Sequence, residues 1–167
     1  MTGPVAAVGW LEGLSPSARQ ALREAMPMRA FADGDVIYRQ GEEGTTLFEI
    51  VSGHLLVVRL SADGVESVLG VLGPGECVGE QGLVAGGPRV TGARACGPVR
   101  VRVLTRAAYE RLRRDHPGIS DRLLRLVVQR LRQTVALIAE QSQSPLDRKS
   151  TRLNSSHRPL TRMPSSA

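Results

Sequence analysis

Two oppositely charged residues, Glu80 and Arg89, stand near the ends of a glycine-rich stretch, GEQGLVAGGPRVTG at residues 79–92. Glu80 begins a possible single helical turn, and the free backbone amides at the start of such a turn are suited to an anion. Arg89 follows the tripeptide GGP, and its guanidinium offers paired donors that match the oxygens of a phosphate diester. Because a carboxylate cannot bind phosphate, Glu80 should face a hydroxyl-bearing part of the same ligand. A sugar joined to a phosphate satisfies both side chains. The plainer interpretation is an exposed ion pair or two solvated charges.

The rest of the sequence offers no catalytic or metal-binding motif. It contains no G-K-[ST] phosphate loop and no H-E-x-x-H zinc motif. His54 and His116 are far apart, each beside a turn, and neither has an evident carboxylate and serine partner. Cys77 and Cys96 lie too far from any histidine cluster for a zinc site, and we expect both to be reduced thiols in the core. We therefore expect no enzymatic activity, no metal and no cofactor.

The elements that must hold the glycine-rich stretch are mostly short β-strands. Between residues 31 and 104 the runs DVIYRQ, TLFEIV, HLLVVRL, VESVLGVL, RVTGARA and VRVRVL are separated by turns such as Asp33-Gly34 and Ser52-Gly53. Strands this closely spaced leave no room for crossover helices, which favours an antiparallel sandwich or jelly roll. In the run from residue 99 to 103, valines alternate with arginines, as expected of a half-exposed strand. The sequence therefore predicts a mainly β fold.

Short helices are predicted on both sides of the β segment. Ser15 followed by Pro16 indicates a helix start, and Pro27 ends this first amphipathic helix. Thr105 is a suitable N-cap for a second helix, AAYERLRRD, which breaks at a Pro-Gly pair at residues 117–118.

A long helix predicted from residue 119 to about 141 is apolar on two faces. One stripe contains Ile119, Leu123, Val127, Leu131 and Ile138, and a second face contains Leu124, Val128, Val135 and Leu137. One face can lie on its own domain, and the other can meet a second copy as a short coiled coil. We therefore expect a homodimer through residues 119–141. The alternative is a helix wrapped entirely by its own domain.

The composition limits the remaining functional classes. At 167 residues the chain is long enough for one domain with a core, and its aromatic content of 3% gives no stacking platform for nucleic-acid bases. No apolar run is long enough to span a bilayer, and the first ten residues lack the features of a signal peptide. We therefore expect a cytoplasmic protein without a membrane partner.

The last residues differ from the rest of the chain. From residue 147 apolar periodicity is lost, which predicts a disordered tail. Residues 147–157, and later RMPSSA at 162–167, also resemble an in-frame translation of a common indexed sequencing adapter, so we expect the natural gene to be cut near Leu146. Residues 147–167 hold five of the 22 basic residues and one of the 16 acidic ones, so residues 1–146 carry a net charge of about +2. This near-neutral charge does not support a DNA-binding face within residues 1–146.

Residues 10–141 resemble the cyclic-nucleotide-binding domain of catabolite-activator-type and FNR-type transcription regulators, kinase regulatory subunits and gated channels. The first half of the resemblance rests on spaced glycine and apolar positions, namely Phe31, Gly34, Ile37, Gly41, Leu47, Phe48, Ile50 and Gly53. The second half is Gly79-Glu80 followed by Gly87-Pro88-Arg89, which is similar to the family's phosphate-binding cassette, G-E-x-x-L-x-x-G-x-P-R-S-A-T.

The resemblance implies a fold and a set of roles. The fold is an eight-stranded antiparallel double-sheet jelly roll with an N-terminal helix and a long C-terminal helix. Arg89 would bind the cyclic phosphate and Glu80 would accept from the ribose 2′-hydroxyl. The backbone amides from Gly79 through Gln81 to Gly82 would complete the anion site. The segment RLRQT is similar to the base-contacting part of the activators' long helix, which nominates Thr134 as a purine contact, against the alternative of a solvent or interface threonine.

One departure from the cassette bears on affinity. The family usually has Ser or Thr directly after the arginine, and this chain has Val90, with Thr91 one position later and on the other strand face. Loss of that hydroxyl weakens binding by on the order of 1 to 2 kcal/mol.

The sequence therefore predicts a β roll at residues 10–118, a dimerisation and signal helix at 119–143, and a disordered, non-native tail at 144–167. We expect a ligand-sensing domain that binds cyclic AMP or cyclic GMP, forming the effector part of a transcription regulator that lacks its helix-turn-helix. DNA would then be contacted only through a missing C-terminal domain. The alternatives are a regulatory module of a transporter, channel or hydrolase, or a domain of the same fold that has lost nucleotide binding.

Overall fold

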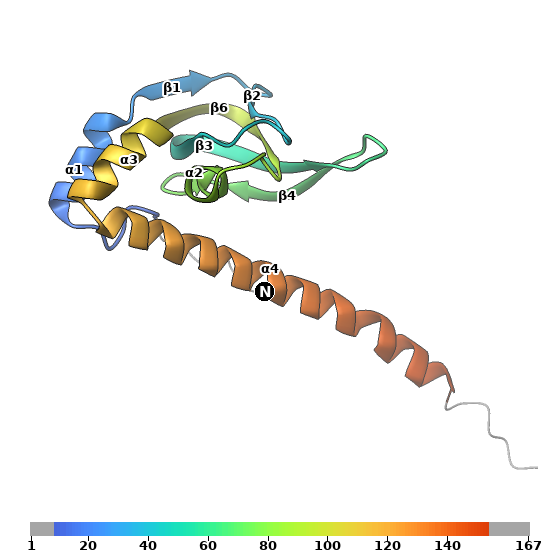
Figure 1. Ribbon diagram of the computed structural model, residues 1–167. Helices are drawn as coiled ribbons and strands as arrows, with labels where there is room; N and C mark the ends of the chain where they lie inside the picture. Colours follow the sequence, from blue (N-terminus) through green and yellow to red (C-terminus); the bar gives the residue numbers. More distant parts are fainter. Residues whose placement is uncertain (1–8, 154–167) are drawn as a thin grey trace, which may run out of the picture. The chain divides into compact units, whose positions relative to one another are not determined.

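Six β-strands pair in one antiparallel sheet within the described part of the chain (Figure 1). The computed structural model describes residues 9–153, with side chains described to residue 142. The strands are β1 (Met28–Phe31), β2 (Val36–Tyr38), β3 (Thr46–Leu60), β4 (Glu66–Leu72), β5 (Cys77–Val78) and β6 (Gly92–Thr105). Neighbouring strands follow the order β1-β6-β3-β4, with β2 paired to β6 and β5 paired to β3.

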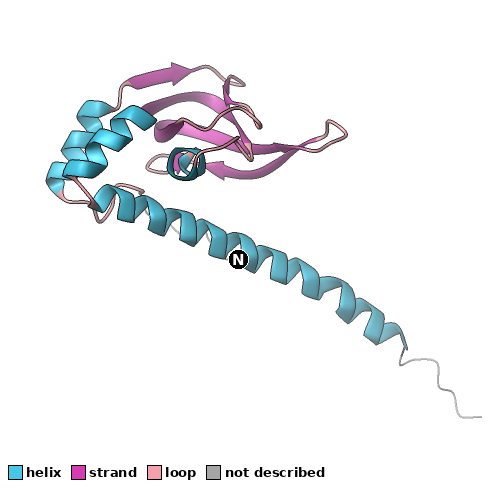
Figure 2. Cartoon of the chain, viewed as in Figure 1, coloured by secondary structure: helices cyan, strands magenta, loops and turns pink. Residues whose placement is uncertain are grey.

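Helices lie before, within and after the strands. They are α1 (Pro16–Ala25), α2 (Glu80–Ala85), α3 (Arg106–Asp115) and α4 (Gly118–Leu153). The predicted caps are confirmed, because Ser15 Oγ accepts from the amide of Ala18 at 3.2 Å and Thr105 Oγ1 accepts from the amide of Ala108 at 3.2 Å. Figure 2 shows α1 and α3 lying together at one end of the strands.

The predicted antiparallel, mainly β architecture is confirmed, but the count of eight strands in two sheets is not. The predicted runs TLFEIV and HLLVVRL are one strand, β3, whose pairing with β6 shifts register on both sides of Ser52. The runs on either side of residues 97–98 likewise join as β6. Gly53 and Gly97 have φ of 83° and 73°, so they bend these long strands without ending them.

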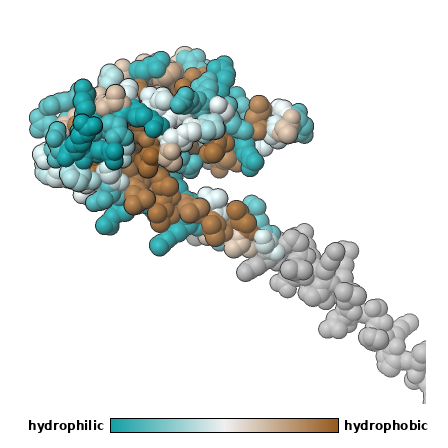
Figure 3. All heavy atoms as spheres, viewed as in Figure 1, coloured by the Kyte–Doolittle hydropathy of each residue, from teal (hydrophilic) through white to brown (hydrophobic). Residues whose placement is uncertain are grey.

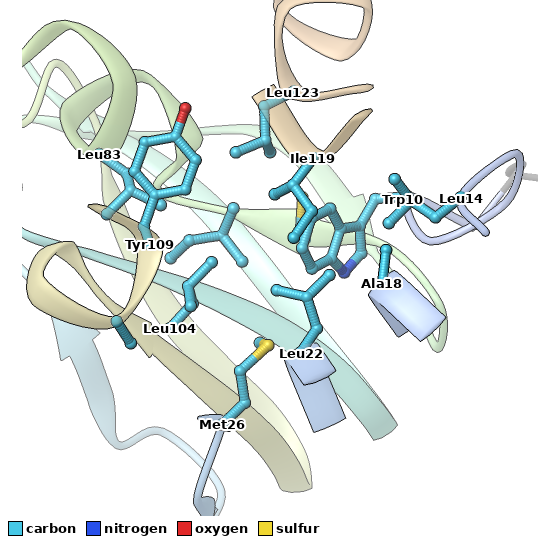
Figure 4. Close-up of a cluster of buried hydrophobic side chains, with 13 residues drawn as sticks. Trp10, Leu14, Ala18, Leu22, Met26, Leu83, Leu104, Tyr109, Ile119 and Leu123 are labelled. Carbon is cyan, nitrogen blue, oxygen red and sulfur yellow. The ribbon is translucent and has the colours of Figure 1, made fainter. Parts of the chain in front are cut away.

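Two buried clusters form the core. One lies within the strands and contains Tyr38, Phe48, Ile50, Leu55, Val78, Ala93, Ala95, Val99, Val101 and Val103. Its valines in β6 alternate with more exposed arginines, as predicted. The other joins helices to strands and includes Trp10, Leu22, Cys77, Leu83, Leu104, Tyr109, Ile119 and Leu123 (Figure 4). The cassette helix α2 and the first turns of α4 therefore share one apolar core.

The two cysteines differ in their surroundings. Both lie in the described residues and neither is in a disulfide, as expected. Cys77 on β5 is buried in the core, whereas Cys96 is exposed, so the predicted core position of Cys96 is wrong. Cys96 stands directly before Gly97, where β6 bends and its side chain faces solvent.

The last helix is longer than predicted. It runs to Leu153, past the expected end near residue 141 and into the segment predicted to be disordered. Loss of apolar periodicity does not by itself end a helix, because Gln, Leu, Lys and Arg have favourable helix propensities. The rest of the predicted tail, 154–167, lies outside the described residues. The chain divides into two compact units, residues 1–128 and 129–167, and α4 contributes to both.

Candidate ligand-binding site

A loop that is far from the glycine-rich stretch in the sequence, residues 41–44, holds that stretch in place. The amide of Gly44 donates to the carbonyl of Gly87 at 3.0 Å, and the amide of Arg89 donates to the carbonyl of Glu42 at 2.7 Å. The amide of Gly41 in turn donates to the carbonyl of Arg89 at 2.8 Å. The backbone around Arg89 is therefore fixed against the loop that leads into β3.

The guanidinium of Arg89 points into the protein. Its side chain is buried, and the residue is only 7% exposed. Nη2 donates to the carbonyl of Thr46 at 2.9 Å and to Thr46 Oγ1 at 2.8 Å, and Nη1 donates to the carbonyl of Gly79 at 3.3 Å. Arg89 is therefore not the exposed ion-pair partner of the plainer interpretation.

Aromatic rings line one side of the guanidinium. Cζ of Arg89 lies 4.1 Å from the ring centroid of Tyr38 and 5.9 Å from that of Phe48, and these two rings are stacked on each other. Burial lowers the pKa of the Arg89 guanidinium, and the nearby charges that oppose this shift belong to Tyr38, Glu42 and Glu80.

One donor of Arg89 has no protein partner. Among the described residues nothing accepts a hydrogen bond from its buried Nε. A buried charged donor without an acceptor is unfavourable, and an anion placed there would remove that cost. The guanidinium therefore has one hydrogen-bond donor that the described residues leave unused.

Gly79 allows the close approach of Arg89 to the start of α2. Gly79 has φ of 90°, and a Cβ built on it would overlap Nη1 of Arg89 and lie 2.6 Å from the carbonyl oxygen of Thr46. The next residue, Glu80, begins α2 and is 3% exposed. Glu80 and Arg89 are therefore both buried, and the Glu80 carboxylate interacts electrostatically with the guanidinium, while their ligand-binding roles stay predictions.

Gly82 has a packing role that sequence reasoning missed. A Cβ on Gly82 would lie 2.6 Å from Cα of Gly44, and a Cβ on Gly44 would lie 2.6 Å from Cα of Gly82. Nη2 of Arg106 donates to the carbonyls of both residues, at 3.0 Å to Gly44 and 2.6 Å to Gly82. Helix α2 is thus held against the loop before β3 by backbone contact and by one arginine.

The remaining predicted site residues are less involved. Gln81 is exposed on α2, and Val90 is 63% exposed. Val90 and Thr91 precede β6, so they do not lie on opposite faces of a strand, and that prediction is wrong. Thr134 belongs to the second compact unit, where its Oγ1 donates to the carbonyl of Arg130 at 3.0 Å. The purine contact predicted for Thr134 stays a prediction.

The residues that sequence reasoning missed are Tyr38, Gly44, Thr46, Phe48 and Arg106. They come from β2, the loop before β3, β3 itself and α3. Each is distant from the cassette in the sequence and contacts one of its residues in the folded chain. Among residues 9–142, no group of three or more His, Cys, Asp or Glu side chains could hold a metal ion. No helix in the part of the chain that the structure describes is both long and apolar enough to cross a bilayer.

The fold is an antiparallel sheet with a buried arginine, Arg89, beside the start of a six-residue helix, α2. The family model for the cyclic nucleotide-binding domain matches residues 28–116. The chain therefore belongs to the cyclic nucleotide-binding domain family.

Named relatives come from more than one kind of protein. The chain is 35% identical over 130 residues to a CRP-like cAMP-activated global transcriptional regulator of Mycobacterium tuberculosis, a match that covers 78% of this chain and 58% of the regulator. The crystal structure of the Thermus thermophilus catabolite activator protein is similar with a TM-score of 0.74 and 30% identity, covering 80% of this chain and 63% of that one. A lysophospholipase of Aspergillus oryzae is 33% identical over 104 residues, which is 62% of this chain and 7% of the enzyme. The chain thus spans somewhat more than half the length of the transcription regulators that it matches.

Proposed function

We propose that this domain binds a cyclic nucleotide of the cyclic AMP type and reports its presence through α4, as the effector part of a transcription regulator. Arg89 holds the cyclic phosphate, and Glu80 accepts a hydrogen bond from the ribose 2′-hydroxyl. The amides of Gly79, Gln81 and Gly82 are the further candidates for the anion. Cyclic AMP is the first candidate because the relative from Mycobacterium tuberculosis is described as cAMP-activated.

The observation that carries this proposal is the state of the Arg89 guanidinium. It is almost fully buried, three of its hydrogen bonds go to Thr46 and Gly79, and its Nε has no acceptor among the described residues. Burial also lowers its pKa, which means that the charged form is partly desolvated. A phosphate diester would supply both the missing acceptor and a compensating charge.

Transmission to α4 is supported by the shared core. Leu83 of α2 and Leu123 of α4 are both buried in the same apolar cluster, together with Ile119 (Figure 4). Such cores pack densely, so a shift of α2 on ligand binding must be accommodated by its neighbours. The ligand then favours one position of α4 over another, and only this difference in affinity can shift the equilibrium.

A homodimer through α4 is also part of the proposal. Beyond the buried first turns, the helix exposes apolar residues at a spacing of four, three, four and three, namely Leu124, Val128, Leu131, Val135 and Ile138 (Figure 3). This is the heptad pattern of a two-stranded coiled coil. DNA contact is assigned to a separate domain and not to residues 9–142.

The binding claim is tested by titrating the chain with cyclic AMP and cyclic GMP in a calorimeter. We expect a Kd well below about 1 mM for wild type and a loss of about 100-fold for Arg89→Gln, because charge-assisted hydrogen bonds are removed. Arg100→Gln is the matched control, since Arg100 is an exposed arginine on β6, and it should bind as wild type does. Thermal unfolding verifies that each variant is folded. Equal binding by Arg89→Gln, or no binding by wild type, would remove the ligand assignment.

A second candidate is a regulatory module within a hydrolase, transporter or channel. The match within the Aspergillus lysophospholipase favours it, because a similar segment occurs there as a small part of a much longer protein. Sequencing the source gene through and past the codon for residue 146 separates the two candidates. A helix-turn-helix pattern would support the regulator, and a catalytic or membrane domain would support the module. The third possibility, a domain of this fold that no longer binds nucleotide, is decided by the calorimetry above.

A further inference from the structure

The hydroxyl that lies beside Arg89 does not come from the cassette. The residue after Arg89 is Val90, which has no hydroxyl and is 63% exposed. The hydroxyl that the structure places against the guanidinium belongs to Thr46, which lies 43 residues earlier and accepts from Nη2 at 2.8 Å. A separate strand therefore supplies a group of the kind that the cassette lacks.

The position of Thr46 is fixed by the sheet. Thr46 is the first residue of β3, and its Cα pairs with Thr105 at the end of β6. Its carbonyl accepts a second bond from the same Nη2 at 2.9 Å, so Thr46 holds the guanidinium at two atoms. A strand residue with a β-branched side chain has few accessible rotamers, so the hydroxyl is held in place before any ligand arrives.

We infer that Thr46 is a positioning residue for Arg89 and replaces, from β3, the hydroxyl that Val90 cannot provide. This inference rests on the proposed function and identifies what orients its central side chain. With Nη2 held by Thr46 and Nη1 held by Gly79, the orientation of the guanidinium is fixed, and its buried Nε–H is the donor left for a phosphate oxygen. The Thr46 hydroxyl accepts from Arg89 and so keeps its own proton to donate.

The neighbouring threonine provides a matched control. Thr45 is exposed, and its carbonyl accepts from the amide of Arg106 at 2.9 Å. Thr45→Val and Thr46→Val therefore make the same chemical change at adjacent residues, and only the second removes a contact with Arg89. Thr46→Ser keeps the hydroxyl and removes only a methyl group.

The test is calorimetric titration of the full chain with cyclic AMP. We expect Thr46→Val to lower affinity about tenfold, while Thr46→Ser and Thr45→Val stay within about threefold of wild type. Rescue by serine shows that the hydroxyl, and not the bulk of the side chain, is responsible, and thermal unfolding verifies that the valine variants are folded. If wild type binds, Arg89→Gln does not, and Thr46→Val matches Thr45→Val, the inference fails while the proposed function stands. If wild type does not bind, the proposed function fails and this inference fails with it.

Discussion

The guanidinium of Arg89 lies over the ring of Tyr38, with Cζ 4.1 Å from the ring centroid. Both side chains are buried, so the attraction between the cation and the ring face acts in surroundings from which water is largely excluded. The ring therefore offsets part of the desolvation that lowers the pKa of Arg89. An aromatic residue from β2 thus helps to keep a charged group inside the protein.

Replacing the aromatic ring at position 38 should weaken ligand binding. We expect Tyr38→Leu to lower affinity for cyclic AMP by about three- to thirtyfold, because a cation–π contact contributes roughly 0.5 to 2 kcal/mol. Tyr38→Phe keeps the ring face and should retain more affinity than the leucine variant. Calorimetry on folded protein measures both, and equal affinities for the two variants would show that the ring contributes no more than its bulk.

The contact between Gly44 and Gly82 should be sensitive to one methyl group. A Cβ on Gly82 would lie 2.6 Å from Cα of Gly44 and 2.9 Å from its carbonyl oxygen, so the loop and α2 must move apart. We expect Gly82→Ala to lower the free energy of unfolding by about 1 to 3 kcal/mol, measured by urea denaturation. Gly118→Ala is the control, because a Cβ there meets nothing within 4 Å, and it should be neutral within about 0.5 kcal/mol. A neutral Gly82→Ala would mean that the contact is not tight.

Local signals in the sequence predicted the elements better than their boundaries. Ser15 and Thr105 were identified as caps because capping depends on residues only three positions apart. Whether Gly53 ends a strand or bends it depends on the partner strand, and β6 continues opposite β3 across that residue. No local pattern carries that information. Each of the two long strands, β3 and β6, is therefore predicted from the sequence as two separate strands.

The candidate site shows the same limit. Glu80 and Arg89 could be found because they share one glycine-rich stretch. Thr46 and Tyr38 lie 43 and 51 positions before Arg89 and reach it only through the pairing of β2, β3 and β6. Thr46 is one of two adjacent threonines, and the sequence gives no reason to choose between them.

The buried carboxylate of Glu49 should make stability depend on pH. Glu49 on β3 is 7% exposed, and its Oε2 lies 3.8 Å from Nη1 of Arg102, its cross-strand neighbour. Burial raises the pKa of Glu49 above its ordinary value of 4.5, although Arg102 and Arg23 oppose the shift. The folded state therefore holds this proton more tightly than the unfolded chain does. The resulting stabilisation is full below about pH 4.5 and is lost as the pH rises through the folded-state pKa.

Urea denaturation of wild type and Glu49→Gln between pH 4 and 7 measures this effect. As the pH rises, we expect Glu49→Gln to become more stable relative to wild type. The difference between their free energies of unfolding should change by about 1.4 kcal/mol for each unit by which folding raises the pKa of Glu49. Glu43→Gln changes an exposed carboxylate and should follow wild type at every pH. A difference between Glu49→Gln and wild type that is constant with pH, or that runs in the opposite direction, would contradict the account.

The exposed apolar stripe of α4 should govern self-association. We expect Leu131→Glu to convert a dimer into a monomer, because it places a charge in the proposed helix seam. Gln133→Glu introduces the same charge off the stripe and should leave the dimer intact. Sedimentation velocity distinguishes the species. A wild-type monomer at all concentrations, or equal association by the two variants, would contradict the proposed interface.

The most direct test of the central claim is an NMR measurement on the Arg89 Nε–H group itself. With ¹⁵N-labelled arginine side chains, the Nε–H resonance of Arg89 is assigned as the one missing from Arg89→Lys. We expect saturating cyclic AMP to shift this resonance strongly and to slow its exchange with water, because a phosphate oxygen becomes its acceptor. If backbone resonances show that cyclic AMP is bound while the Arg89 Nε–H resonance stays in place, the ligand does not use Arg89 and the account is contradicted.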